Sequence, residues 1–266
     1  IGTSLPTVMK QLGSSEVVTD ILGIDVAYAS EEQDMPLRFV KIDYIITEGT
    51  DIIFSFAGEE IKIITENNAL KGVVDSTGAA VSANNDLVQV SSYEDGATGY
   101  TIIVAKTAKY TWHFVVVENQ AYFVTPTGTP IQLDKVESMG FENNQDFATY
   151  RGYIWSRTLP LLKDTAFLGK GADTYIIHFA QDDYAGRYNI TYFTDARNIV
   201  VDKPHNMYLG AAVNTGVISM VALIAIYVIY LAESVKLYRK HTFESYAEYI
   251  GMGICIAIAG FMVSGL

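Results

Sequence analysis

His205 is the residue of this chain whose type and position most directly suggest chemistry. It stands with Asn206 immediately before an uncharged run that begins at Met207. Imidazole titrates near neutral pH and can take a proton from a hydroxyl group as a general base. A histidine beside such an apolar run would offer this chemistry at a lipid–water boundary. A capping or interfacial role for His205 is the alternative, and the residue type alone leaves both open.

Basic side chains between residues 143 and 209 could hold a phosphate near that histidine. The planar fork of arginine is well suited to this, because it can donate two parallel hydrogen bonds to phosphate oxygens. Asp202 could orient the imidazole of His205, although Asp202 and Lys203 could equally form a solvated turn. The cations of this region are Arg151, Arg157, Arg187, Arg197 and Lys203.

Two uncharged runs would position these residues at a membrane. The first, Met207 to Ala232, has 26 residues, and the second, Ile250 to Leu266, has 17. A helix of roughly 20 apolar residues crosses a hydrocarbon core of about 30 Å. We therefore expect transmembrane helices over 207–232 and 250–266, with a buried helical hairpin in a soluble protein as the alternative.

The segment between the two runs, 233–249, sets the expected orientation. It carries Lys236, Arg239 and Lys240, and basic residues in short loops mark the cytoplasmic side of a membrane. Residues 1–206 would then be extracellular or periplasmic, and His205 would lie at the outer membrane surface. The chain starts without Met, a basic n-region or an apolar h-region. We accordingly expect it to be a fragment of a multi-pass membrane protein, with earlier transmembrane helices missing.

The net charge, the motifs and the cysteine count exclude several classes of function. Half of the 266 residues are hydrophobic and the net charge is −12, which argues against nucleic acid as a partner. No nucleotide-binding motif and no clustered pattern of metal ligands is present in the sequence. The single cysteine, Cys255, lies within the second apolar run, so it cannot form an internal disulfide. We expect neither a cofactor nor a metal.

The outer segment predicts a mixed fold. Residues 1–36 have helical spacing in places, whereas 37–140 contain short β-branched and aromatic stretches separated by turn residues. This pattern predicts a β-rich domain, either an antiparallel sandwich or a small barrel. Residues 141–206 are predicted to form a helical and loop-rich region. Aromatic residues of the β-rich part could form a sugar-binding face or the core; they are Tyr100, Tyr110, Trp112, Phe114, Tyr122 and Phe123.

The order of motifs around His205 resembles the O-antigen ligase and O-antigen polymerase superfamily. His205-Asn206, nine residues and then Gly216 are similar to that superfamily's signature, in which a Gly, Thr or Tyr follows three residues later. Ser219 occupies that last position here, which is a departure. The stretch "YRGYIWSRTLPLLKDTAFLGKGADTY" resembles the other block of the superfamily. The matching residues in it are Arg151, Trp155, Lys163, Asp164, Gly169 and Gly171. The resemblance covers about residues 147–266.

The resemblance implies a glycosyltransferase that uses a glycan on undecaprenyl pyrophosphate as its donor and a glycan or lipid as its acceptor, without a metal ion. It implies that His205 is the base that activates the acceptor hydroxyl and that Arg151 holds the donor pyrophosphate. A second arginine of the superfamily comes from an earlier outer loop and is missing from this sequence, so we expect this stretch to be inactive alone.

Further residues could line the same site. We name Asn206, Arg157 and Arg187 as substrate-binding candidates, with a surface role as the alternative for the two arginines. Gly169 and Gly171 could present backbone N–H groups to phosphate or simply form a tight turn. A different class of function also stays open, that of a membrane-anchored carbohydrate-binding or adhesion ectodomain without catalysis.

Overall fold

The computed structural model describes residues 36–190, 199–240 and 242–266. The expected helical segment 1–36 therefore lies almost entirely outside the described residues. The chain folds into two compact units. The first contains the residues up to Val136 together with Asp182–Ile199, and the second contains Glu137–Gln181 and Val200–Leu266.

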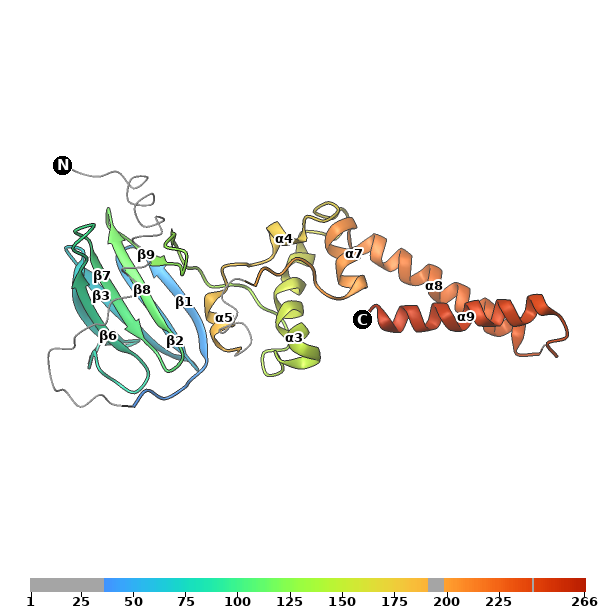
Figure 1. The fold of residues 1–266 in the computed structure, drawn as a ribbon, viewed down its shortest axis with the longest axis horizontal. Helices are drawn as coiled ribbons and strands as arrows, with labels where there is room; N and C mark the ends of the chain where they lie inside the picture. Colours follow the sequence, from blue (N-terminus) through green and yellow to red (C-terminus); the bar gives the residue numbers. More distant parts are fainter. Residues whose placement is uncertain (1–35, 191–198, 241) are drawn as a thin grey trace. The chain divides into compact units, whose positions relative to one another are not determined.

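The first unit contains two antiparallel sheets (Figure 1). Within the described residues each sheet has five strands, ordered β1-β2-β3-β4-β5 and β10-β9-β8-β7-β6. The strands of the first sheet are β1 (Ile42–Glu48), β2 (Asp51–Phe56), β3 (Glu59–Glu66), β4 (Ala69–Asp75) and β5 (Ala80–Val81). Those of the second are β6 (Gln89–Glu94), β7 (Thr101–Lys106), β8 (Thr111–Val117), β9 (Gln120–Val124) and β10 (Pro130–Ile131).

Tight turns join neighbouring strands because their residues accept a positive φ. Asn67 and Asn68 connect β3 to β4 with φ of 54° and 63°, and Glu118 and Asn119 connect β8 to β9 with φ of 52° and 63°. Two consecutive positive φ values make the hairpin turn whose twist matches that of the strands. Each sheet is therefore built from local hairpins.

Both sheets contribute to one hydrophobic core. The Phe54 ring of the first sheet lies 6.0 Å from the rings of both Trp112 and Phe114 of the second. Trp112, Phe114 and Phe123 are almost fully buried, so these three aromatic residues form core and not an open sugar-binding face. Tyr100 and Tyr122 pack instead against a separate small cluster formed by Ile102, Val115, Val117 and Val124. The mixed α/β class is confirmed, and the choice between sandwich and barrel stays a prediction.

A segment distant in sequence completes the first unit. Helix α5 (Tyr184–Tyr188) packs on β1. Asn189, the next residue, accepts a hydrogen bond from the Ile42 amide at 2.9 Å and donates one to the Ile42 carbonyl at 2.8 Å. A single side chain thus satisfies both backbone groups of Ile42, which would otherwise stay unpaired in the interior.

The second unit is helical. Its outer part comprises α3 (Phe147–Thr158), the 3-10 helix η1 (Leu159–Lys163), α4 (Tyr175–His178) and α7 (Met207–Thr215). Residues 148–150 of α3 have φ between 49° and 66°, so regular helical geometry begins at Arg151. The Tyr175 hydroxyl lies 2.6 Å from the Thr158 hydroxyl and joins α4 to α3. Burial raises the pKa of Tyr175, which keeps that hydroxyl protonated.

Two apolar helices complete this unit, α8 (Val217–Tyr238) and α9 (Tyr246–Ser264) (Figure 1). Within the described residues, these are the two helices that are long and apolar enough to cross a membrane. Very few of their residues are buried in the isolated chain. They extend a few residues past the expected limits into the polar connection. Ser245 and Glu248 form a capping box that fixes the start of α9.

Candidate functional site

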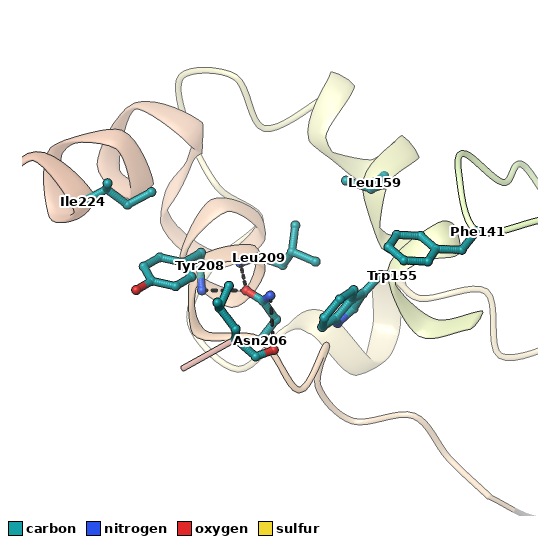
Figure 2. A pocket seen from close by; sticks show the side chains of 8 residues that line it. Phe141, Trp155, Leu159, Asn206, Tyr208, Leu209 and Ile224 are labelled. Carbon is teal, nitrogen blue, oxygen red and sulfur yellow. Dashed lines mark hydrogen bonds between the residues drawn. The ribbon is translucent and has the colours of Figure 1, made fainter. Parts of the chain in front are cut away.

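His205 lies at the start of α7 with its side chain exposed. Its φ of 51° places it in the left-handed region, so the chain turns sharply before the helix begins. The next residue, Asn206, caps α7, since its side-chain oxygen accepts hydrogen bonds of 3.0 Å from the amides of Tyr208 and Leu209 (Figure 2). This use of asparagine satisfies two amides that have no partner within the helix.

Gly216 ends the same helix. Its φ of 108° and ψ of 153° suit glycine alone, and a Cβ added there would lie 2.7 Å from the Phe167 carbonyl oxygen. The helix expected over 207–232 is consequently divided into α7 and α8 at this residue. The nine residues between Asn206 and Gly216 are the nine residues of α7. The motif spacing therefore encodes the length of one short helix.

The Gly-x-Gly loop packs against the far end of α7. The amides of Lys170 and Gly171 donate to the carbonyls of Val213 and Asn214 at 2.8 Å and 3.1 Å. A Cβ added to Gly169 would lie 2.1 Å from the Asn214 backbone. The Gly171 amide thus binds a helix carbonyl that has no intrahelical partner, and Gly169 allows the close approach of two backbones.

Trp155 links the helix of Arg151 to the loop of His205. Its indole Nε1 donates a hydrogen bond of 2.8 Å to the carbonyl oxygen of Pro204, 49 residues away in sequence. Arg151 is half-buried and precedes Trp155 by four residues in the regular part of α3. Side chains four residues apart share one face of a helix. The face of α3 that carries Arg151 therefore also contacts the residue before His205.

The remaining cations occupy different environments. Arg157 is buried, where it donates to the Ser156 hydroxyl at 2.8 Å and lies 4.5 Å from the centre of the Tyr153 ring. Arg187 is in α5 of the first unit and donates to the Ile199 carbonyl at 3.0 Å. Lys203 is exposed, 3.9 Å from Asp202, and Arg197 lies outside the described residues. These contacts indicate structural roles for Arg157 and Arg187.

A cavity of about 400 Å³ lies beside Asn206 in the second unit (Figure 2). Its wall is almost wholly apolar and includes the Trp155 ring. The sequence analysis did not predict this cavity. The only sequence signal for it was the tryptophan inside the block that contains Arg151. The residues that line the cavity are Phe141, Trp155, Leu159, Asn206, Tyr208, Leu209, Ile224 and Leu266.

Comparison with known proteins supports the interpretation of the motifs. A family model described as O-antigen ligase matches residues 97–224. The matched range begins in the β-rich unit, about fifty residues before the stretch that resembles the superfamily by its motifs, and ends within α8. No curated protein and no solved structure matches the chain. Arg151, Trp155, His205, Asn206 and Gly216 all fall inside the matched range. The match confirms the superfamily predicted for this part of the chain, that of the O-antigen ligases and polymerases.

Proposed function

We propose that the protein transfers or polymerises a glycan carried on undecaprenyl pyrophosphate at the outer face of a bacterial membrane. The family match implies lipid-linked glycan substrates and membrane association. The observation that carries the proposal within this chain is the Trp155–Pro204 hydrogen bond, because it joins the Arg151-bearing face of α3 to the His205 loop.

In this proposal His205 is the general base. Its exposed imidazole takes the proton of an acceptor hydroxyl, and the resulting oxygen nucleophile attacks the anomeric carbon of the donor. A new glycosidic bond forms as the bond from that carbon to the pyrophosphate oxygen breaks. The electron pair leaves with the undecaprenyl pyrophosphate, and the proton on the imidazole passes to solvent. General-base catalysis of this kind contributes about 10²–10⁴ to a rate.

Arg151 is the proposed ligand of the pyrophosphate. Negative charge grows on the pyrophosphate oxygens as their bond to the anomeric carbon breaks, and a fixed guanidinium stabilises that charge more than it stabilises the bound donor. Its place at the first regular turn of α3 gives the side chain a defined direction. Asn206, Gly169 and Gly171 would serve the site by holding α7, which starts at the base.

The expected topology fits this chemistry. With α8 and α9 in the membrane and Lys236, Arg239 and Lys240 on the cytoplasmic side, α7 and His205 lie at the outer surface. The isoprenoid chain of the carrier stays in the bilayer, while its pyrophosphate and the acceptor hydroxyl meet in water beside α7.

The test is made in the complete protein, with surface glycan measured in cells. We expect His205→Ala to lower glycan transfer by about a hundredfold or more, and Arg151→Ala to lower it strongly as well. Arg38→Ala is the control, since it removes an exposed cation of the first unit. Wild-type amounts of glycan in both site variants at normal expression would favour the non-catalytic ectodomain instead.

A further inference from the structure

The loop between η1 and α4 presents two large apolar side chains, which we call the apolar tip. In the isolated chain Phe167 is 77% exposed and Leu168 is 80% exposed. Single exposed apolar residues are ordinary on protein surfaces, but two adjacent ones of this size favour burial against an apolar partner. Charged residues stand on either side of the tip, Asp164 before it and Lys170 after it, 3.4 Å apart.

Backbone hydrogen bonds attach the first part of this loop to α8. The amide of Val217, the first residue of α8, donates to the Thr165 carbonyl oxygen at 2.8 Å. The next amide, that of Ile218, donates to the Ala166 carbonyl oxygen at 3.3 Å. Amides in the first turn of a helix have no partner within the helix. The residues immediately before the apolar tip therefore satisfy the start of α8.

The residues after the tip bind α7 instead. As described above, the amides of Lys170 and Gly171 donate to the Val213 and Asn214 carbonyls at the end of that helix. Two hydrogen bonds on each side thus hold the apolar tip at the break between α7 and α8. This pairing also suits the edge of a bilayer, because backbone groups that leave water need partners within the protein.

The dimensions of α8 place this break at one surface of a membrane. The helix has 22 residues, which corresponds to about 33 Å, close to the roughly 30 Å of a hydrocarbon core. If α8 crosses the bilayer, its first residue therefore lies at one edge of the core. Ile218 and Val221, in its first turns, are each 55% exposed in the isolated chain. The apolar tip is consequently attached to the end of a helix whose own apolar surface a bilayer would cover.

We propose that Phe167 and Leu168 insert into the membrane interface, in the leaflet where α8 begins. The partner is the lipid bilayer, at the boundary between headgroups and acyl chains. Insertion at this depth buries the apolar tip, while Asp164 and Lys170 stay among headgroups and water. The inserted tip holds the break between α7 and α8 at the membrane surface. The proposal depends on α8 lying in the membrane and not on the chemistry of glycan transfer.

A fluorescent label at the tip measures its surroundings. In the complete protein without other cysteines, Cys255→Ser included, Leu168→Cys is labelled with the environment-sensitive dye NBD and placed in phosphatidylcholine nanodiscs. We expect loss of most of the emission when the lipids carry a nitroxide near the headgroup end of the acyl chain, and little loss with aqueous iodide. Ser76→Cys is the control, since this residue is exposed in the turn between β4 and β5, and it should respond in the reverse way.

Two outcomes of the labelling experiment would overturn the proposal. Quenching of the label at residue 168 by iodide, and not by the lipid nitroxide, would place the tip in water. Protection from both quenchers would show that protein covers the tip, such as another helix of the complete chain. Neither outcome depends on catalysis, so the activity of His205→Ala, which tests the proposed function, is a separate result.

A second measurement needs no label. Phe167→Ser/Leu168→Ser removes the apolar tip, and it should disturb little packing within the chain because both side chains are mostly exposed. In nanodiscs we expect hydrogen exchange at the Val217 and Ile218 amides to become about tenfold faster, which corresponds to the burial of one such side chain. Ile177→Ser, at an exposed apolar residue of α4, should leave these amides unchanged. Unchanged exchange in the double variant, or the same acceleration in the control, would contradict insertion of the tip.

Discussion

Asn206 and Gly216 are the two ends of one helix. The asparagine side chain caps the first turn of α7, and the glycine, at a φ of 108°, stops the helix after nine residues and allows α8 to start in a new direction. The nine-residue spacing between Asn206 and Gly216 in the motif is therefore the length of helix α7. It places His205, one residue before the cap, at a fixed distance from the start of α8.

The cap can be tested at Asn206. Asn206→Ala should cost about 1 kcal/mol of helix stability, since the amides of Tyr208 and Leu209 lose their acceptor. Asn206→Asp keeps that acceptor and should restore most of the loss. Hydrogen exchange at these two amides measures the effect directly. Equal protection in the alanine variant and the natural protein would contradict the capping role.

The helix break can be tested at Gly216. Gly216→Ala should lower stability by about 1–3 kcal/mol, because non-glycine residues rarely adopt such a backbone conformation, and its Cβ would also press on the Phe167 carbonyl. Gly253→Ala is the matched control, since the position lies within α9 and its added Cβ would meet open space. Thermal unfolding in detergent compares the two, and a Gly216 variant as stable as the control would refute the argument.

The junction between α5 and β1 can be tested at Asn189. Asn189→Ala leaves both backbone groups of Ile42 without their partners, which should cost about 1–3 kcal/mol. In this variant we expect hydrogen exchange to become faster at the Ile42 amide and to change little elsewhere. Asp182→Ala, in the same returning segment and exposed, should leave that exchange unchanged. Exchange at Ile42 that is identical in all three proteins would exclude the side-chain bridge.

Stability of the β-rich unit should depend on pH through His113. Burial lowers the pKa of this histidine, so the folded state keeps it neutral at pH values where the unfolded chain already binds a proton. The free energy of unfolding should then fall as pH drops below the ordinary histidine value of about 6.5. Hydrogen exchange at the backbone amides of β7 and β8 follows the unfolding of this unit. His113→Gln should weaken the dependence of the unfolding free energy on pH. If that dependence were unchanged, other titrating groups would be its cause.

Membrane orientation can be measured by cysteine labelling. In a Cys255→Ser background, a cysteine at Asp202 should react in intact cells with a reagent that cannot cross the membrane. A cysteine at Lys240 should react only after the membrane is opened, because basic residues favour the cytoplasmic side. The reverse pattern would place His205 inside the cell and remove the proposed site from the outer surface.

Several features of this protein followed from the sequence alone. The uncharged runs indicated the two apolar helices, because the ability to cross a bilayer depends on local length and composition. The alternating β-branched and aromatic stretches predicted the strands, since hairpins form between neighbours in the chain. The order of short motifs indicated the superfamily. Each of these signals lies within a short stretch of residues.

Other features were decided only by the tertiary structure. The sequence could not separate Arg151, on the face of α3 shared with Trp155, from Arg157, which is buried against Tyr153. Nor could it show that Trp112, Phe114 and Phe123 are core, or that Trp155 meets Pro204. Burial and pairing across tens of residues depend on how the whole chain packs, and a given side chain has the same local sequence signal whether its partner is solvent, a ring or a distant carbonyl.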